Sequence, residues 1–391
     1  MPSVSVKLYS IIYKFILKRQ LQTLTDQNPS NQFGVISRPD ESFAPANPTF
    51  SQNDVATKDI HINPLKSLSV RIFLPNSVTS NGLLSQTDGV YGGYSPVVSS
   101  GGGRRLPVVL QFHGGGFVTG SSVSVGNDVF CRRIAKACDA IVIAVGYRLA
   151  PESKFPAAFE DGFEVMNWLV KQANLNDCKS SGGRVGFERR QIVDGFGETF
   201  IEPWIAAHAD LSRCVLLGVS SGSNIANYVT QKAVEAGSLL DPIRVVAQVL
   251  MYPFVIGSTP TKSEIKLANS YLYDRTMAIL AWKLFLPADQ FNLDHPAANP
   301  LMSAKRVPLK QMPPTLTIVA EHDWMRDRAI AYSQELRKVN VDAPVYDYKD
   351  AVHEFATFEM FLKTPKAQAC VEDIAIWVKK YISLRGLEFS Y

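Results

Sequence analysis

A serine between two glycines is the first feature of this sequence that could do chemistry. Residues 218–222 read Gly-Val-Ser-Ser-Gly, with an apolar run before them and a helical pattern after them. The apolar run, residues 214–217, predicts a buried strand, so Ser220 lies on a sharp strand–turn–helix connection that exposes its hydroxyl. The helix N-terminus favours negative charge that develops beside it. The pattern indicates Ser220 as a nucleophile for acyl transfer, although an ordinary glycine-flanked turn can read the same way.

A glycine-rich loop supplies the second feature. Residues 113–117 read His-Gly-Gly-Gly-Phe and follow another apolar run, residues 108–112. The glycines, Gly114 to Gly116, leave backbone N–H groups free to converge on one point, and with the N–H of Ser221 they could hold a tetrahedral oxyanion. A phosphate-binding loop is the alternative, but no G-x-x-x-x-G-K-[ST] pattern is present. We expect His113 to orient the loop through hydrogen bonds rather than to take part in catalysis.

An acid and a base follow the nucleophile in the order Ser220, Asp323, His353. Asp323 comes directly after the apolar run of residues 315–319, and His353 follows a last strand pattern at residues 344–348. His353 would take the proton from the serine, and Asp323 would fix the tautomer of the imidazole. Asp327 is a rival acid further from the strand end, and Glu321 is a weaker rival.

The elements that must position these residues alternate along the chain. Apolar, β-branched runs are separated by segments of helical periodicity, which indicates an α/β protein with a mostly parallel sheet covered by helices on both faces. Strands are expected near residues 68–74, 108–112, 140–145, 214–217, 245–250, 315–319 and 344–348. Helices are expected near residues 128–137, 157–172, 221–236, 275–286, 326–339 and 374–382. Two polar, glycine- and serine-rich insertions, at about residues 76–105 and 174–200, are predicted to be surface loops.

The N-terminus has its own pattern. Residues 4–17 are mostly apolar but contain two lysines, so they are too short and too charged to span a membrane or to act as a signal peptide. We predict an amphipathic helix whose apolar face packs against the body of the protein, and docking on a membrane surface is the alternative. The residues of that face are Leu8, Ile11, Ile12, Phe15 and Ile16.

Composition excludes several classes of function. Of 391 residues, 46% are hydrophobic, and the formal net charge is only +4 with no long basic run, so nucleic acid is not an expected partner. Five cysteines without a C-x-x-C pair favour free thiols in a reducing compartment, which predicts the cytoplasm, with the nucleus as an alternative. The six histidines are scattered without ligand spacing, and we predict neither a metal nor a cofactor.

Longer motifs resemble a known family. Residues 113–117, 147–152, 155–158 and 160–162, together with the serine motif, look like the hormone-sensitive-lipase-related carboxylesterases. Residues 204–206, 294–300 and 323–327 resemble its plant carboxylesterase branch, which is related to the gibberellin receptors. The resemblance implies the α/β-hydrolase fold, with an eight-stranded, mostly parallel sheet and a helical cap drawn partly from the N-terminus. It therefore implies a cap or lid at residues 1–55 and a catalytic domain at 56–391.

The resemblance also implies oxyanion donors at Gly114, Gly115 and Ser221. Three positions, each next to a candidate catalytic residue in the sequence, depart from the family pattern. Relatives usually carry aspartate before the nucleophile and alanine after it, where this chain has Val219 and Ser221. A small residue is common after the histidine, where this chain has Glu354.

The function that these features indicate is hydrolysis of small-molecule carboxylic esters through a Ser-His-Asp acyl-enzyme. A hormone-type receptor is the first alternative, although such receptors resemble this family with the catalytic histidine replaced, and His353 is present here. A lyase or cyclase is the second, although the dehydratases tend to carry threonine where this chain has Ser220. A small-molecule ester is the expected partner, and the sequence predicts no oligomeric state.

Overall fold

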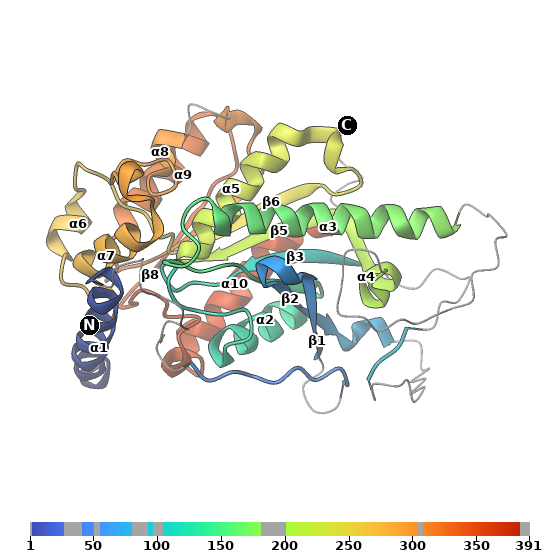
Figure 1. Cartoon of the computed structure of the whole chain (residues 1–391), viewed down its shortest axis with the longest axis horizontal. Coiled ribbons are helices and arrows are strands. Elements are labelled where there is room, and N and C mark those ends of the chain that lie inside the picture. Colours follow the sequence, from blue (N-terminus) through green and yellow to red (C-terminus); the bar gives the residue numbers. More distant parts are fainter. Residues whose placement is uncertain are drawn as a thin grey trace.

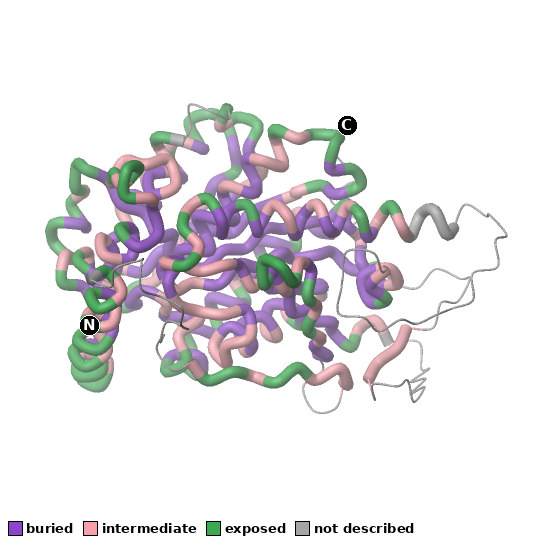
Figure 2. The backbone as a smooth tube through the Cα atoms, viewed as in Figure 1, coloured by how far each residue is buried: buried purple, intermediate pink, exposed green. Residues whose placement is uncertain are grey.

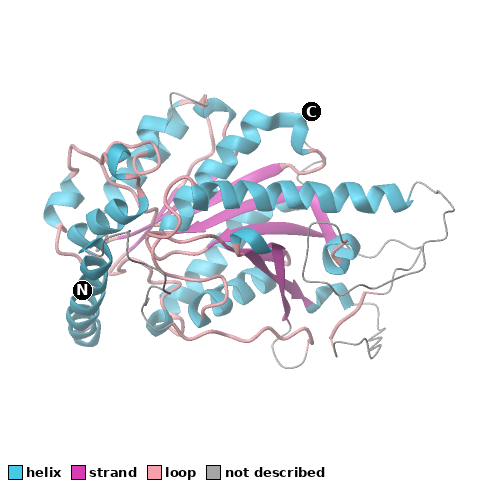
Figure 3. Ribbon diagram, viewed as in Figure 1, coloured by secondary structure: helices cyan, strands magenta, loops and turns pink. Residues whose placement is uncertain are grey.

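The structure is a computed structural model that describes most of the chain. The described residues are 2–26, 41–50, 55–79, 93–96, 105–180, 201–303 and 308–383. An eight-stranded sheet lies at the centre, with helices on both of its faces (Figures 1 and 3). Most of the first predicted insertion and residues 181–200 of the second lie outside the described residues.

The strand order in the sheet is β1-β2-β4-β3-β5-β6-β7-β8. In chain order the strands are β1 (Val55–Asn63), β2 (Leu68–Pro75), β3 (Leu106–Phe112), β4 (Ile141–Gly146), β5 (Ala209–Val219), β6 (Val245–Met251), β7 (Thr315–Ala320) and β8 (Val345–Tyr348). β2 pairs antiparallel with β1 and β4, and all the other pairs are parallel. The predicted fold class is therefore confirmed. β1, an edge strand with alternating burial over its second half, was not predicted.

Helices connect the parallel strands and cover the sheet. The helices are α1 (Val4–Asp26), α2 (Val125–Cys138), α3 (Ala157–Ser180), α4 (Pro203–His208), α5 (Ser221–Ala236), α6 (Lys262–Lys266), α7 (Arg275–Phe285), α8 (Pro300–Ser303), α9 (Arg326–Lys338) and α10 (Pro365–Ile382). The sequence pattern placed the end of the third one near residue 172 and an irregular insertion from residue 174. That boundary is wrong, because α3 continues as regular helix to Ser180.

Alternation of side chains along the central strands builds a core on each face of the sheet. In β5, Leu216 packs in one apolar cluster, whereas Val215 and Leu217 pack in the other. Successive side chains of a strand point to opposite faces, so a strand covered on both sides reads as a continuous apolar run. The buried tube through the centre of Figure 2 follows these strands. This packing holds the carboxyl ends of β3, β5, β7 and β8 at one edge.

The N-terminal helix packs differently from the prediction. α1 contacts α7 and is longer than expected, since it runs to Asp26. The side that faces the body holds the buried Ser10, Leu17 and Leu21. The predicted apolar face points to solvent instead, with side chains between 49% exposed at Ile16 and 69% exposed at Phe15. The prediction that this face packs on the protein is wrong, because the helix carries apolar residues on two sides and only the other one is covered.

Among the described residues, none of the helices has both the length and the apolar character that crossing a membrane requires.

Candidate active site

Ser220 lies on a strained turn between β5 and α5. Its backbone has φ 51° and ψ −118°, a sparsely populated combination that costs on the order of 1–3 kcal/mol. Its N–H donates to the Met251 carbonyl at 2.9 Å, and its carbonyl accepts from the amides of Ser223 at 2.9 Å and Phe254 at 3.2 Å. These bonds hold the turn in place. A Cβ on Gly222 would lie 2.2 Å from the Phe112 carbonyl oxygen, so only glycine fits at this end of the motif.

The structure brings Ser220, His353 and Asp323 together in one hydrogen-bonded chain. The Ser220 Oγ lies 2.8 Å from His353 Nε2, and His353 Nδ1 lies 2.8 Å from Asp323 Oδ2. All three residues are buried. Burial works to lower the pKa of His353, but the Asp323 carboxylate, and then Glu354, outweigh it and raise that pKa above its ordinary value. An imidazole held this way is a base whose proton affinity is increased by its acidic partner.

Geometry separates Asp323 from the rival acids. Its Oδ1 accepts from the Met325 amide at 2.9 Å, so each carboxylate oxygen has a fixed partner. Asp327 points elsewhere and accepts from the Ser263 amide at 2.8 Å. Glu321 accepts from the Asp350 amide at 2.9 Å. Neither rival is hydrogen-bonded to the histidine.

The glycine loop after β3 runs beside Ser220. Gly115 has φ 111° and Gly116 has φ 62°, and a Cβ on Gly115 would lie 2.1 Å from the Thr119 carbonyl oxygen. A Cβ on Gly114 would lie 3.3 Å from the Ser220 Cβ. Within the described part of the chain, the amides of Gly114, Gly115 and Ser221 donate to no other protein group. These unpaired donors beside the serine are what an oxyanion site requires.

His113 and an aromatic cluster hold this loop. His113 Nδ1 donates to the Gly114 carbonyl at 2.7 Å, its ring stacks on Tyr147 at 4.2 Å, and burial lowers its pKa to about 4. The imidazole is therefore neutral near pH 7, in keeping with the predicted orienting role. On the other side, Phe117 stacks on Phe285 of α7 at 4.0 Å and lies 5.2 Å from Trp282. α7 thus fixes the loop through buried aromatic packing.

Two residues beside the triad were not assigned a role from the sequence. A Cβ on Gly114 would lie 2.4 Å from Glu354 Oε1, so this carboxyl group rests on the glycine loop next to the nucleophile. The Tyr273 hydroxyl lies 2.7 Å from the Cβ that Gly116 lacks, and its ring is 6.2 Å from the His353 ring. The unusual residue at 354 was visible in the sequence. Nothing in the sequence pointed to Tyr273, because only the tertiary fold brings it to this edge.

The other two positions that depart from the family pattern, Val219 and Ser221, are both buried. Val219 is buried and packs in the apolar cluster beneath the turn, where its side chain contributes to the core. Ser221 is fully buried at the start of α5, close to the Tyr147 hydroxyl. The apolar side chain at position 219 therefore suits its apolar surroundings, in which a charged aspartate would have no solvent.

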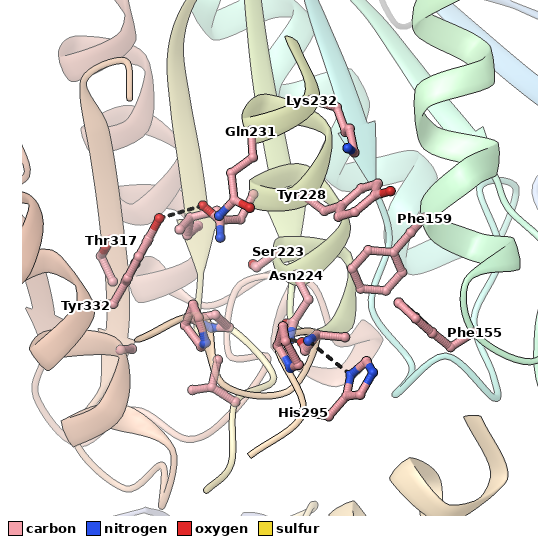
Figure 4. Close-up of a pocket in the computed structure, with 18 of the residues that line it drawn as sticks. Phe155, Phe159, Ser223, Asn224, Tyr228, Gln231, Lys232, His295, Thr317 and Tyr332 are labelled. Atoms are coloured by element: carbon pink, nitrogen blue, oxygen red, sulfur yellow. Dashed lines mark hydrogen bonds between the residues drawn. The ribbon is translucent and has the colours of Figure 1, made fainter. Parts of the chain in front are cut away.

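A cavity of about 240 Å³ lies behind the nucleophile turn. It is bordered by Asn224 and Tyr228 of α5, by Phe159, by His295 and by Tyr332, all labelled in Figure 4. None of the triad residues or the glycine-loop residues lines it. It is a space distinct from the candidate catalytic groups.

One group of potential metal ligands occurs in the ranges that the structure describes: Glu321, His322 and Asp350, whose ligand atoms lie within 4.8 Å of one another. Asp350 is exposed, and a backbone N–H already occupies one Glu321 oxygen. Exposed acidic groups of this kind are common without an ion, so the cluster gives no reason to revise the prediction made for metals.

Comparison with known proteins agrees with this architecture. Residues 109–357 match a family model described as the alpha/beta hydrolase fold. "Probable carboxylesterase 11" of Arabidopsis thaliana is 58% identical over the whole of both chains, and a gibberellin receptor of the same plant is 29% identical over 83% of this chain and 81% of that one. The solved structure of carboxyl esterase 2 from the fungus Tuber melanosporum superposes with a TM-score of 0.63 at 19% identity, covering 94% of this chain and 98% of that one. The chain therefore belongs to the α/β-hydrolase family, in the branch that holds the plant carboxylesterases and, more distantly, the gibberellin receptors.

Proposed function

We propose that this protein hydrolyses small-molecule carboxylic esters through an acyl-enzyme on Ser220. The observation that carries the proposal is the chain of two 2.8 Å hydrogen bonds from Ser220 through His353 to Asp323. High identity to a relative named a probable carboxylesterase, over the full length of both chains, supports it.

The reaction proceeds in two halves. The Ser220 oxygen attacks the ester carbonyl carbon while His353 Nε2 accepts the serine proton, and the oxyanion is held by the amides of Gly114, Gly115 and Ser221. The C–O bond to the alcohol then breaks, and the alcohol leaves with the proton from His353. Water attacks the acyl-enzyme with His353 again as base, and the carboxylic acid leaves as Ser220 recovers its proton.

Replacement of the nucleophile tests this assignment. The Ser220→Ala variant should lose hydrolysis of p-nitrophenyl acetate by at least about 10⁴-fold, because no acyl-enzyme can form. Ser223→Ala, one turn further along α5, is the matched control and should keep most of the activity. Its hydroxyl donates to the Gly218 and Met251 carbonyls and to none of the triad residues. Unchanged turnover in the Ser220 variant would overturn the proposal.

The receptor alternative is disfavoured by His353, which lies within hydrogen-bond distance of the serine. A fluorophosphonate probe separates the two functions. An esterase of this kind should be labelled at Ser220, as read by mass spectrometry of the peptide, and a pure receptor should react slowly.

We further propose that residues 1–55 form a cap or lid and that the protein works in the cytoplasm. Support for the lid comes from Lys14 of α1, which lies 3.3 Å from the Asp274 carboxylate at the start of α7. Glu41 supports it too, because it accepts from the Gly120 amide at 2.7 Å. Support for the compartment comes from the described cysteines, which are buried free thiols as expected under reducing conditions. Deleting residues 1–26 should therefore alter the preference among esters, and a fluorescent fusion should report the compartment.

A further inference from the structure

Glu354 is the most unusual group at the active site. A Cβ on Gly114 would lie 2.4 Å from the Glu354 carboxyl oxygen and 3.3 Å from the Ser220 Cβ. The carboxylate therefore borders the space where an ester must bind. We infer that Glu354 forms a subsite for a positively charged group of the substrate, so that this enzyme prefers esters that carry an ammonium group. The inference rests on the proposed ester hydrolysis and names its substrate class.

No protein cation neutralises this carboxylate. In the described part of the chain Glu354 forms no side-chain hydrogen bond and no ion pair, and burial is the main cause that raises its pKa. The nearby groups that act on it electrostatically are His353, Glu41 and Asp323, and two of these three are acids.

The backbone at Glu354 is also unusual. It has φ 59°, in the left-handed region that favours glycine, and this costs on the order of 1–3 kcal/mol for other residues. Its carbonyl accepts from the amides of Thr357 at 3.1 Å and Phe358 at 2.9 Å, which fixes the conformation. The strained backbone therefore holds the carboxylate against the glycine loop.

An aromatic side chain borders the same space. The Tyr273 hydroxyl lies 2.7 Å from the position of a Cβ on Gly116, and its ring is 6.2 Å from the His353 ring. Burial is the main cause that raises the pKa of Tyr273, and the Glu354 carboxylate is among the groups that raise it further. A carboxylate near an aromatic ring is the chemistry that binds alkylammonium groups, through charge attraction and cation–π contacts.

The reaction itself explains why a cation suits this place. A bare carboxylate beside the glycine loop opposes the oxyanion that develops on the substrate, because like charges in a poorly solvated site repel. An ammonium group on the substrate cancels that repulsion. The cation therefore favours the transition state as well as binding, and its effect should be on kcat/KM.

A pair of isosteric esters tests the inference. Acetylcholine and 3,3-dimethylbutyl acetate differ only in a quaternary nitrogen replaced by carbon, and a betaine ester with its carbon analogue places the cation on the acyl side instead. At about pH 8 the wild type should favour the cationic member of at least one pair by about tenfold in kcat/KM. Glu354→Gln should bring that ratio close to one, and Glu354→Asp should retain part of it.

Glu359→Gln is the matched control, because it removes an exposed carboxylate from the same segment and should leave the ratio unchanged. A wild-type ratio near one for both pairs, or a ratio that survives in Glu354→Gln, would overturn the inference. If the wild type hydrolyses neither these esters nor p-nitrophenyl acetate, the proposed function fails, and calorimetric binding of the same pairs to the Ser220→Ala protein still tests the subsite. Equal affinity for both members would then overturn it.

The outer face of α1 carries a second, independent inference. This outer face consists of six large apolar side chains that are between 49% and 71% exposed: Val4, Leu8, Ile11, Ile12, Phe15 and Ile16. They recur at helical spacing and form one stripe, and an exposed apolar stripe of this kind marks an interaction site. In Figure 2 the helix lies at the periphery of the molecule, largely exposed along its outer side.

We infer that the outer face of α1 docks on an anionic lipid surface. Charge favours lipid over a second protein. α1 contains no acidic residue before Asp26, and its cations Lys7, Lys18 and Arg19 lie beside or within the stripe. A helix with an apolar face bordered by basic side chains lies in the plane of a membrane interface, and each basic residue near the surface adds attraction to anionic headgroups.

Vesicle sedimentation of the full chain tests this inference. Wild type should sediment with phosphatidylcholine vesicles that contain 30% phosphatidylserine and at least tenfold less with phosphatidylcholine alone. Phe15→Glu should abolish sedimentation, whereas Leu65→Glu, at a 99% exposed leucine elsewhere, should not. Absence of sedimentation of the wild type would refute it. A concentration-dependent dimer that Phe15→Glu dissociates would equally refute it, because the stripe would then be a protein interface.

Discussion

Replacing Asp323 with asparagine tests the proposed triad at the residue whose role depends most on geometry. Asp323 Oδ2 accepts the Nδ1 proton of His353 at 2.8 Å, while Oδ1 accepts the Met325 amide at 2.9 Å. In the asparagine variant the amide oxygen keeps the Met325 bond, and the NH₂ group faces the histidine. A donor then meets a donor, so the imidazole changes tautomer and presents Nε2–H to Ser220. A protonated Nε2 cannot accept the serine proton.

The expected loss in kcat is about 10⁴-fold, which corresponds to about 5.4 kcal/mol of transition-state stabilisation. The pH dependence should change as well. Since Asp323 helps raise the pKa of His353, its removal should move the acidic limb of the kcat/KM profile to lower pH. The direction follows because the active form of His353 is the neutral one, which appears above its pKa.

Hydrolysis of p-nitrophenyl acetate from pH 5 to 9 measures both effects. Asp327→Asn is the matched control, since it removes the rival acid. The Asp327 carboxylate accepts a hydrogen bond from the Ser263 amide at the start of α6. The control should leave kcat close to that of the wild type, because the asparagine Oδ1 can still accept the Ser263 amide. If Asp323→Asn retains more than a tenth of wild-type kcat, or if both variants lose activity equally, the assignment of the acid is refuted.

Three further predictions concern the groups around the triad. Glu354→Gln should shift the acidic limb of kcat/KM to lower pH, because the carboxylate adds to the raised pKa of His353, and an unshifted profile would show that the two groups do not interact. Gly115→Ala should lower kcat by at least about 10²-fold, because its Cβ would lie 2.1 Å from the Thr119 carbonyl oxygen and displace the oxyanion donors; full activity would contradict that geometry. Phe117→Ala should lower the free energy of unfolding by about 3–5 kcal/mol, measured by urea denaturation, because it removes a fully buried ring, and a loss below 1 kcal/mol would show that the packing of α7 does not depend on it.

Local pattern in the sequence was enough to predict the central strands and the order of the catalytic candidates. Strands that are buried on both faces appear in the sequence as continuous apolar runs. The glycines of the serine motif indicate Ser220, because only glycine fits at position 222, where the Phe112 carbonyl approaches. Strand ends then placed Asp323 and His353 at one edge without any knowledge of distance. These are features in which local chemistry and the fold agree.

Tertiary structure decided everything that depends on contacts between distant segments. α1 has apolar residues on two sides, and periodicity alone could not tell which side would be covered by α7. Asp323 and Asp327 were separated by their partners, because the Asp323 carboxylate reaches His353 whereas the Asp327 carboxylate accepts the Ser263 amide. The sequence marked Glu354 as unusual, but only its position on the glycine loop, beside Ser220, gives that carboxylate a chemical meaning. Its field acts through space on groups far apart in the chain, and no spacing of residues encodes such a distance.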